Sequence, residues 1–174
     1  MIIIEVILVD KDDKIIGTEE KIKAHKNGGK LHRAFSIFIF NNQNELLIQR
    51  RSFNKYHSGG LWSNSCCSHP LLGEKIIVSA KKRLKQELGF VCKLKQKFKF
   101  KYEVHFENGL TEKEIDYVFV GICNKNIDIN PNPKEVNEWR WISYNKLKKD
   151  LEANNEKYTH WFKLSLDKVI QVIK

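Results

Sequence analysis

Two neighbouring stretches decide the fold of this chain: CSHPLLGE at residues 67–74 and AKKRLKQELGF at residues 80–90. The first overlaps the end of the segment Ser52–Pro70. This segment is rich in Gly, Ser, Asn and aromatic residues without periodicity, so we expect a loop there. Around the second, apolar residues recur at spacings of three and four, namely Ile77, Ala80, Leu84 and Leu88. This pattern predicts a helix over Glu74–Leu88, and Gly89 is a natural stop for it.

Working outward, apolar runs bounded by turn residues predict strands. They lie at Ile2–Val9, Ile15–Glu20, Phe35–Phe40, Leu46–Arg50, Phe98–Phe106, Ile115–Cys123 and Trp139–Ile142. The turn Asn41–Glu45 indicates a hairpin between the third and fourth of these. Further helices are expected at Tyr144–Ala153 and Trp161–Val172. Strands mixed with helices and separated by hairpins predict a single α/β domain over residues 1–174, an α/β sandwich with a mixed sheet.

Composition sets the broad class. Hydrophobic residues make up 41% of the chain and charged residues 30%, which is typical of a globular protein. The apolar run Met1–Val9 is too short to span a bilayer and lacks the features of an export signal, so we expect a cytoplasmic protein. The net charge of +10 is compatible with nucleic acid, an anionic membrane or an anionic small molecule as partner. Most of the lysines are better explained as solvated surface residues.

Three histidines in or beside loops, His25, His32 and His69, are candidate metal ligands. Glu112 and Glu114 are two apart at the start of a predicted strand, so their side chains point to one face. Imidazole nitrogens with carboxylate oxygens suit zinc, manganese or iron. Taken singly, each histidine is more often a surface or hydrogen-bonded residue than a ligand, and spacing alone does not assemble the site.

Cys67 stands beside a histidine in a polar loop, within the run NSCCSHP at residues 64–70. Nearby positive charge would lower the pKa of such a thiol and activate it. The alternative is a small buried residue, which is the interpretation for Cys66. For Cys67 the local sequence leaves both possibilities open.

Several motifs occur in an order that resembles the type 1 isopentenyl-diphosphate isomerases of the Nudix fold superfamily. The match includes CSHPLLGE and AKKRLKQELGF, and upstream of them Lys21, His25, Leu31-His32, Ala34-Phe35-Ser36, Arg50-Arg51, Lys55 and Leu61 to Ser65. Downstream it includes Tyr102, Glu112-Lys113-Glu114 and Trp161. The similarity runs from about Lys21 to Val120 and thins toward the C-terminus. It implies a Nudix-like α/β/α sandwich with a mixed sheet.

The resemblance also implies a reaction, the interconversion of isopentenyl diphosphate and dimethylallyl diphosphate for isoprenoid biosynthesis. A proton is added at one carbon and another is removed two carbons away, which requires an acid and a base across the substrate. The family assigns these roles to Cys67 and Glu114, with Tyr102 assisting. Substrate binding falls to Lys21, Arg51, Lys55 and Arg83 around the diphosphate, with the ring of Trp161 facing the carbocation.

Two kinds of metal follow from the same resemblance. One Mn²⁺ or Zn²⁺ would be bound by His25, His32, His69, Glu112 and Glu114. A Mg²⁺ would bridge the diphosphate to Glu87, as suits an ion that binds through few carboxylates plus phosphate oxygens. The expected partner is therefore a small molecule, with no nucleic acid or membrane, and the protein is expected to be a monomer or weak dimer.

The Nudix hydrolase box G-x5-E-x7-R-E-U-x-E-E-x-G-U, where U is aliphatic, is only partly present. Counted from Ser68, it retains Glu74, Leu84, Glu87 and Gly89, but Arg83 and Gln86 replace two carboxylates that hydrolases use to hold metals. Ser68 also replaces the glycine usual in both families. The first alternative, a hydrolase of a nucleoside diphosphate derivative, is therefore poorly supported. The second is an RNA-binding module, which would need the aromatic residues of Lys95–Tyr102 to be exposed.

Overall fold

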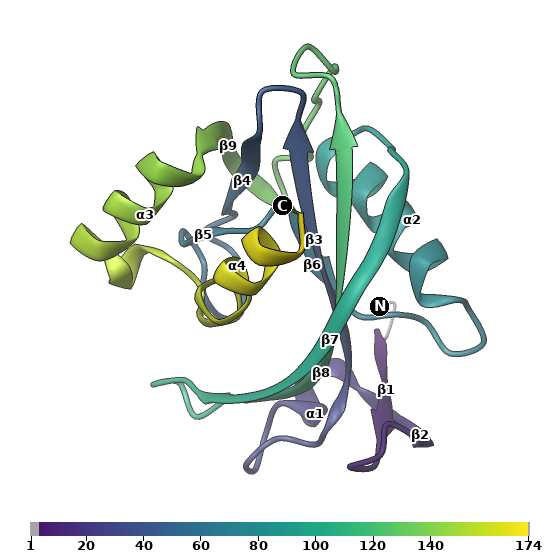
Figure 1. The fold of residues 1–174 in the computed structure, drawn as a ribbon. Helices are drawn as coiled ribbons and strands as arrows, with labels where there is room; N and C mark the ends of the chain where they lie inside the picture. The colour runs from purple at the N-terminus through teal and green to yellow at the C-terminus, as the bar shows by residue number, and fades with distance from the viewer. Residues whose placement is uncertain (1–3, 174) are drawn as a thin grey trace.

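The computed structural model describes residues 4–173, in which nine strands form one mixed sheet with helices on both faces (Figure 1). The strands are β1 (Glu5–Val9), β2 (Ile15–Glu20), β3 (His32–Asn41), β4 (Glu45–Arg51), β5 (Trp62–Ser63), β6 (Cys66–Ser68), β7 (Leu94–His105), β8 (Thr111–Cys123) and β9 (Val136–Ser143). The helices are α1 (Lys21–Ala24), α2 (Ile76–Leu88), α3 (Tyr144–Ala153) and α4 (His160–Ile173), with a 3₁₀ turn at Asn155–Lys157.

Strand β3 is the centre of the sheet. It pairs parallel with β8 along its whole length, from His32 opposite Glu114 to Asn41 opposite Cys123. It also pairs antiparallel with β1, β4 and β6. Strand β7 continues the sheet beyond β8, while β9 and β5 pair with β4. The predicted hairpin between β3 and β4 and the predicted mixed sheet are both confirmed.

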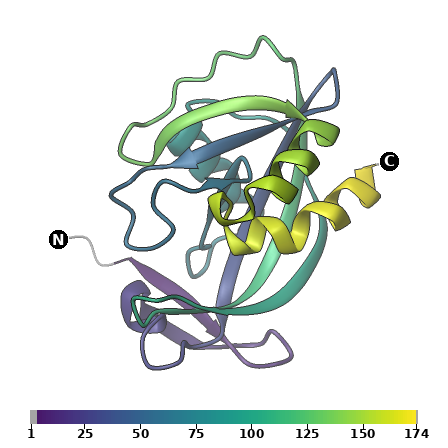
Figure 2. The same cartoon turned by 90° about the vertical axis from the view of Figure 1, so that its left-hand side faces the viewer.

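Alternate residues of β3 belong to two separate hydrophobic cores, because side chains point to opposite faces of a sheet. Phe35, Ile37 and Ile39 are buried against the face covered by α2. Phe38 and Phe40 point the other way, into the core beneath α4. The two views in Figures 1 and 2 show α2 on one side of the sheet and α3 with α4 on the other. The chain thus forms the α/β/α sandwich expected from its sequence.

Helix α2 ends as its sequence predicts. Gly89 adopts a left-handed conformation with φ of 81°, and its N–H donates to the Lys85 carbonyl. A Cβ atom at this position would lie 2.6 Å from the Asn130 carbonyl oxygen, so both the backbone angle and the space favour glycine. Ala80, Leu84 and Leu88 are fully buried, whereas Ile77 is only partly so.

Most strands extend further than predicted. The segment Ser52–Pro70, predicted to be a loop, contains two short strands. These are β5 and β6, whose two and three residues are too few for a periodic pattern. The predicted strand Ile2–Val9 begins at Glu5 among the described residues, and its first two residues lie outside them. Ser68 belongs to β6 and does not have a positive φ, so serine is compatible with the backbone here.

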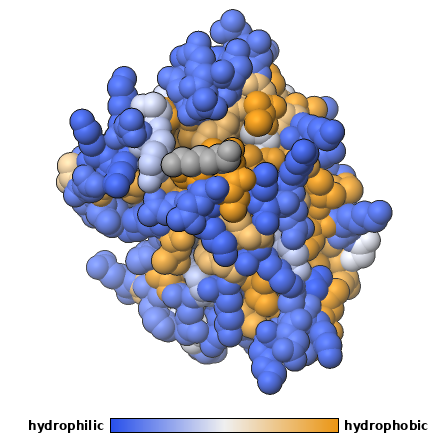
Figure 3. Space-filling model, in the orientation of Figure 1, coloured by the Kyte–Doolittle hydropathy of each residue, from blue (hydrophilic) through white to orange (hydrophobic). Residues whose placement is uncertain are grey.

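Hydrophilic side chains project over much of the face of the molecule shown in Figure 3. Apolar surface is exposed between them, and the most exposed large apolar residues include Ile16 and Ile122. None of the helices described in residues 4–173 is long and apolar enough to cross a membrane.

The turn between β1 and β2 is fastened to the sheet by Asp13, a residue with a left-handed φ of 65°. Its carboxylate accepts a hydrogen bond from Arg33 Nε at 2.8 Å and one from Lys99 Nζ at 2.7 Å, and the Tyr117 hydroxyl donates to it as well. Burial alone would raise the pKa of Asp13, but these three donors hold the pKa below its usual value of 3.8.

Because the folded-state pKa of Asp13 is depressed, its carboxylate stabilises the fold at neutral pH, and this contribution is lost as the pH falls through the folded-state pKa. We expect Asp13→Asn to lower the free energy of unfolding by about 1–2 kcal/mol at pH 7, since it removes charge-assisted hydrogen bonds. Denaturant unfolding of both proteins should show this difference disappearing in acid. Asp12→Asn, an exposed change in the same turn, is the matched control and should have little effect at either pH.

Candidate functional site

The face of the sheet beneath α4 changes from apolar to polar along β8. At one end, Val118 and Val120 belong to the core under α4. At the other, Glu112 and Glu114 are buried and line a pocket that opens to solvent, with about 490 Å³ of empty space when the solvent at its mouth is included. Because every second side chain of β8 points to the same face of the sheet, this one strand contributes both to the hydrophobic core and to the candidate site.

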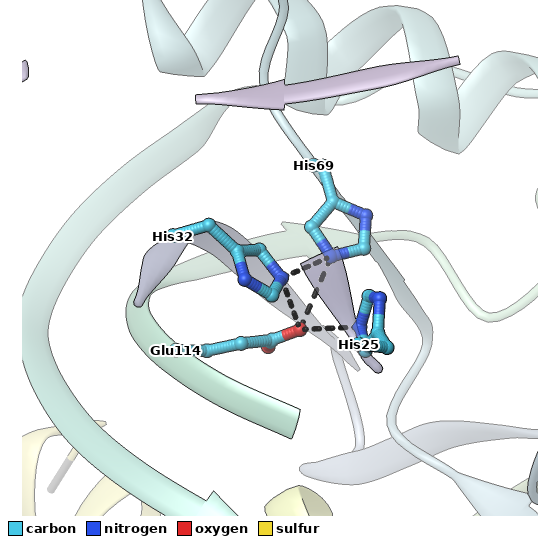
Figure 4. A group of neighbouring side chains, drawn as sticks. All are labelled: His25, His32, His69 and Glu114. Atoms are coloured by element: carbon cyan, nitrogen blue, oxygen red, sulfur yellow. Dashed lines mark hydrogen bonds and ion pairs between the residues drawn. The ribbon is translucent and has the colours of Figure 1, made fainter. Parts of the chain in front are cut away.

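One oxygen of Glu114 is surrounded by three imidazoles (Figure 4). The Nε2 atoms of His25, His32 and His69 lie 3.8, 3.2 and 3.1 Å from its Oε1. His32 begins β3 directly opposite Glu114 on β8, His25 follows α1, and His69 follows β6. The structure therefore brings together four of the five residues predicted to bind one metal, and Glu112 lies two residues from Glu114 on the same face.

This group fits a divalent cation. His25 Nδ1 and His32 Nδ1 donate to the carbonyls of Lys21 and Lys30 at 2.6 and 2.7 Å, because a carbonyl oxygen only accepts. When the rings are neutral, their Nε2 lone pairs face the Glu114 carboxylate. His25 Nε2 is buried and has no hydrogen-bond partner in the described chain. Converging lone pairs of this kind require a proton or a metal ion between them.

The pKa values of the two buried glutamates are shifted in opposite directions. Burial alone would raise the pKa of Glu114, but the three imidazoles hold this pKa well below its usual value. Burial and the neighbouring Glu114 charge raise the pKa of Glu112. Tyr102, directly opposite Glu114 in the register of β7 and β8, donates from its hydroxyl to Oε2 of Glu114 at 2.6 Å and to Oε2 of Glu112 at 3.1 Å. The tyrosine thus links both carboxylates.

Strand alternation also separates the two adjacent cysteines. In β6, Cys66 pairs with Ile37 and is buried in the core beneath α2, whereas Cys67 pairs with Ser36 and lines the pocket. Burial raises the pKa of Cys67 to about 12, although Arg51 Nη1 lies 3.7 Å from its sulfur. Burial thus outweighs the neighbouring guanidinium, so the pKa of Cys67 moves in the direction opposite to that expected from nearby positive charge alone. The Cys67 side chain holds its proton at neutral pH.

Four basic side chains also line the pocket, and we call them the basic wall. The wall consists of Lys21, Arg51, Lys55 and Arg83. Burial, followed by repulsion from Lys55 and the two arginines, lowers the pKa of Lys21 to about 8. Four cationic side chains in the lining of one pocket could bind a multiply charged anion.

Two carboxylates lie behind this wall. Glu135 accepts from Arg83 Nη2 at 2.7 Å and also pairs with Lys55. Glu87 accepts from Arg83 Nε at 2.8 Å and from Gln49 Nε2 at 2.8 Å. Glu87 is buried and is not among the residues that line the pocket, and each of its oxygens accepts one of these hydrogen bonds.

Trp161, at the start of α4, is both a core residue and part of the pocket wall. Its indole N–H donates to Ser63 Oγ at 3.0 Å and to Asn64 Oδ1 at 3.1 Å, which fixes the plane of the ring. The guanidinium of Arg51 lies 5.1 Å from the ring centre. The late aromatic predicted from sequence thus reaches the site from the far end of the chain.

Three residues of the site were missed in the sequence. Tyr56 and His57 line the pocket, although the sequence offers no periodicity at these positions. His57 is one of six histidines, and its residue type alone did not distinguish it. Glu135 precedes β9 after a proline-containing loop and gives no local signal. Only the fold brings Tyr56 and His57 to the pocket and Glu135 to two of the basic residues that line it.

Comparison with known proteins first defines the class. A NUDIX domain matches residues 30–162. Solved structures with this fold include a protein from Deinococcus radiodurans, with a TM-score of 0.70 and 18% identity over 86% of this chain and 90% of that one. Another is a MutT protein from Methanosarcina mazei, with a TM-score of 0.66 and 20% identity over 83% of this chain and 96% of that one. The chain is thus a Nudix-domain protein.

Sequence relatives narrow the assignment. Isopentenyl-diphosphate Delta-isomerase 2 of Aromatoleum aromaticum is 45% identical over 95% of this chain and 86% of its own length. Isopentenyl-diphosphate Delta-isomerase of Serratia proteamaculans is 45% identical over 90% of this chain and 86% of its own length. The chain belongs to the isopentenyl-diphosphate Delta-isomerase family and is an enzyme of the isomerase class.

Proposed function

We propose that this protein interconverts isopentenyl diphosphate and dimethylallyl diphosphate in isoprenoid biosynthesis. The observation that carries the proposal is a single pocket lined by a thiol, Cys67, by the hydrogen-bonded side chains Glu114 and Tyr102, and by four cationic side chains. Moving a double bond requires a proton donor and a proton acceptor, and a diphosphate requires positive charge.

Cys67 and Glu114 are assigned to the two proton transfers. They come from β6 and β8, which lie on either side of β3, so a small substrate can sit between them. In one direction a proton is added to the methylene carbon, and another is removed two carbons away. The reaction is reversible, so the group that acts as acid in one direction acts as base in the other. Tyr102 hydrogen-bonds the Glu114 carboxylate and holds it in place.

The remaining residues bind and shield the substrate. Lys21, Arg51, Lys55 and Arg83 neutralise the diphosphate. The π face of Trp161 stabilises a developing carbocation by roughly 2 kcal/mol in a desolvated site. Exclusion of water from this pocket protects the cation from capture.

Divalent metals complete the proposal. One Mn²⁺ or Zn²⁺ would be held by His25, His32, His69, Glu112 and Glu114. A Mg²⁺ bound with the diphosphate would use Glu87. The transition metal would supply a fixed positive charge that orients the Glu114 carboxylate, and the magnesium ion would offset the charge of the diphosphate.

The alternatives are less well supported. A nucleoside diphosphate hydrolase would need more helix carboxylates than α2 provides, since Arg83 forms ion pairs with Glu87 and Glu135 instead of binding metal. An RNA-binding surface would need exposed aromatic residues on β7. Phe98 and Phe100 instead pack against the core beneath α4, and Tyr102 is buried. A single domain, a cytoplasmic location and a monomeric or weakly dimeric state remain predictions.

The two adjacent cysteines give a matched test of the catalytic assignment. We expect Cys67→Ala to lower kcat by on the order of 10²–10⁴-fold, the usual contribution of a positioned acid or base, with the fold intact by circular dichroism. Cys66→Ala should retain most of the activity, because this side chain faces the opposite core. Equal losses in the two variants, or no loss in either, would contradict the assignment.

Removal of metal tests the histidine cluster. A chelator should inactivate the enzyme, and His25→Ala or His69→Ala should reduce the transition metal retained after purification, measured by elemental analysis. His105→Ala is the control, since the His105 side chain is 71% exposed at the end of β7. Full activity in protein shown to contain no transition metal would rule the cluster out as a required metal site.

Reaction in deuterated water separates isomerase from hydrolase. With isopentenyl diphosphate and Mg²⁺, the protein should form dimethylallyl diphosphate that carries deuterium in the methyl group made from the methylene carbon. The diphosphate should remain intact, because the basic wall binds charge but positions no water. Nucleoside diphosphate derivatives in the same buffer should persist. Faster release of phosphate or of a nucleoside monophosphate than double-bond migration would favour the hydrolase.

A further inference from the structure

His57 is a buried histidine that the proposed reaction does not use. It lies between β4 and β5 and is only 7% exposed. Its Nε2 lies 3.1 Å from Oε1 of Glu112, and its Nδ1 lies 3.3 Å from the Ser58 hydroxyl. An imidazole this close to a buried carboxylate affects where that carboxylate can point.

Three aromatic side chains hold the His57 ring in one orientation. The ring stacks on Phe106 with centroids 4.8 Å apart and an interplanar angle of 17°. It meets Tyr56 nearly edge-on at 4.3 Å and Trp161 nearly edge-on at 6.0 Å. Because the ring is enclosed in this way, it cannot turn away from Glu112 without disturbing the pocket wall.

Both oxygens of Glu112 therefore have a neighbour that restrains them. Tyr102 donates to Oε2 at 3.1 Å, and His57 contacts Oε1 at 3.1 Å. His57 does not belong to the group of four atoms formed by Glu114 Oε1 and the three imidazole nitrogens around it. It belongs to a second group, with His25 and Glu112, whose atoms lie within 4.8 Å of one another. His57 is thus placed to act on the cluster through Glu112.

We propose that His57 is a positioning residue of the metal centre, which fixes the Glu112 carboxylate so that it can bind the ion together with the histidines and Glu114. The inference rests on the metal centre of the proposed function. Side chains that orient metal-binding carboxylates contribute about 10–100-fold to metal affinity. His57 supplies this orientation from the loop after β4, which also contributes Lys55 to the basic wall of the same pocket.

The test is a double-mutant cycle on metal affinity. The dissociation constant for Zn²⁺ is measured by competition with a chromophoric chelator in the wild-type protein, His57→Ala, Glu112→Gln and the double variant. We expect His57→Ala to weaken binding about 10–100-fold. In the Glu112→Gln background the same change should have almost no further effect, because His57 acts through that carboxylate.

Two further variants separate a local effect from a general loss of structure. His57→Gln preserves much of the side-chain volume and an N–H donor, so it should recover part of the affinity, and it carries the test if His57→Ala does not fold. His105→Ala, an exposed change, should bind Zn²⁺ like the wild type.

Unchanged affinity in both folded His57 variants would overturn the role of His57 alone. Equal losses in the presence and absence of the Glu112 carboxylate would also overturn it, since His57 would then act independently of Glu112. A wild-type protein that binds no Zn²⁺ or Mn²⁺ would overturn the metal centre of the proposed function together with this inference.

Discussion

The parallel pairing of β3 with β8 is the constraint on which the rest of the molecule depends. Ten consecutive residue pairs set the register, and the first of them places His32 beside Glu114. A shift of one residue would reverse every side chain of β8 relative to the sheet, moving the glutamates toward α2 and the valines of the core out of it. The hydrophobic core and the polar site are therefore fixed by the same set of backbone hydrogen bonds.

Strand β3 also determines from which side its neighbouring strands contribute side chains to the pocket. Because β6 pairs with β3 on the side opposite β8, the thiol of Cys67 reaches the pocket from one side of β3 and the carboxylate of Glu114 from the other. The basic wall is built differently, from α1, β4, the loop after β4 and α2. A rigid central sheet thus positions the reactive groups, while the cations come from several elements, and one of them, Lys55, from a loop.

Local features could be predicted from the sequence, and non-local ones could not. The helix ending at Gly89 was predicted because its periodicity and its stop signal are contained in one continuous segment. The cluster of three histidines and Glu114 was predicted only through family resemblance, since no spacing rule connects His25 with Glu114 across β3 and β8. His57 and Glu135 were missed for the same physical reason. Each gains its role from a contact with a residue more than 50 positions away in the chain.

The histidine and glutamate cluster has a consequence for the stability of the protein. Its members come from three separate parts of the chain, between residues 25 and 114, and converge only when β3, β6 and β8 are all assembled. An unfolded chain cannot offer this arrangement, so an ion bound there favours the folded state by mass action, by about 2.7 kcal/mol at a free concentration one hundred times its dissociation constant. Metal supply would then govern how long the enzyme survives as well as how fast it works.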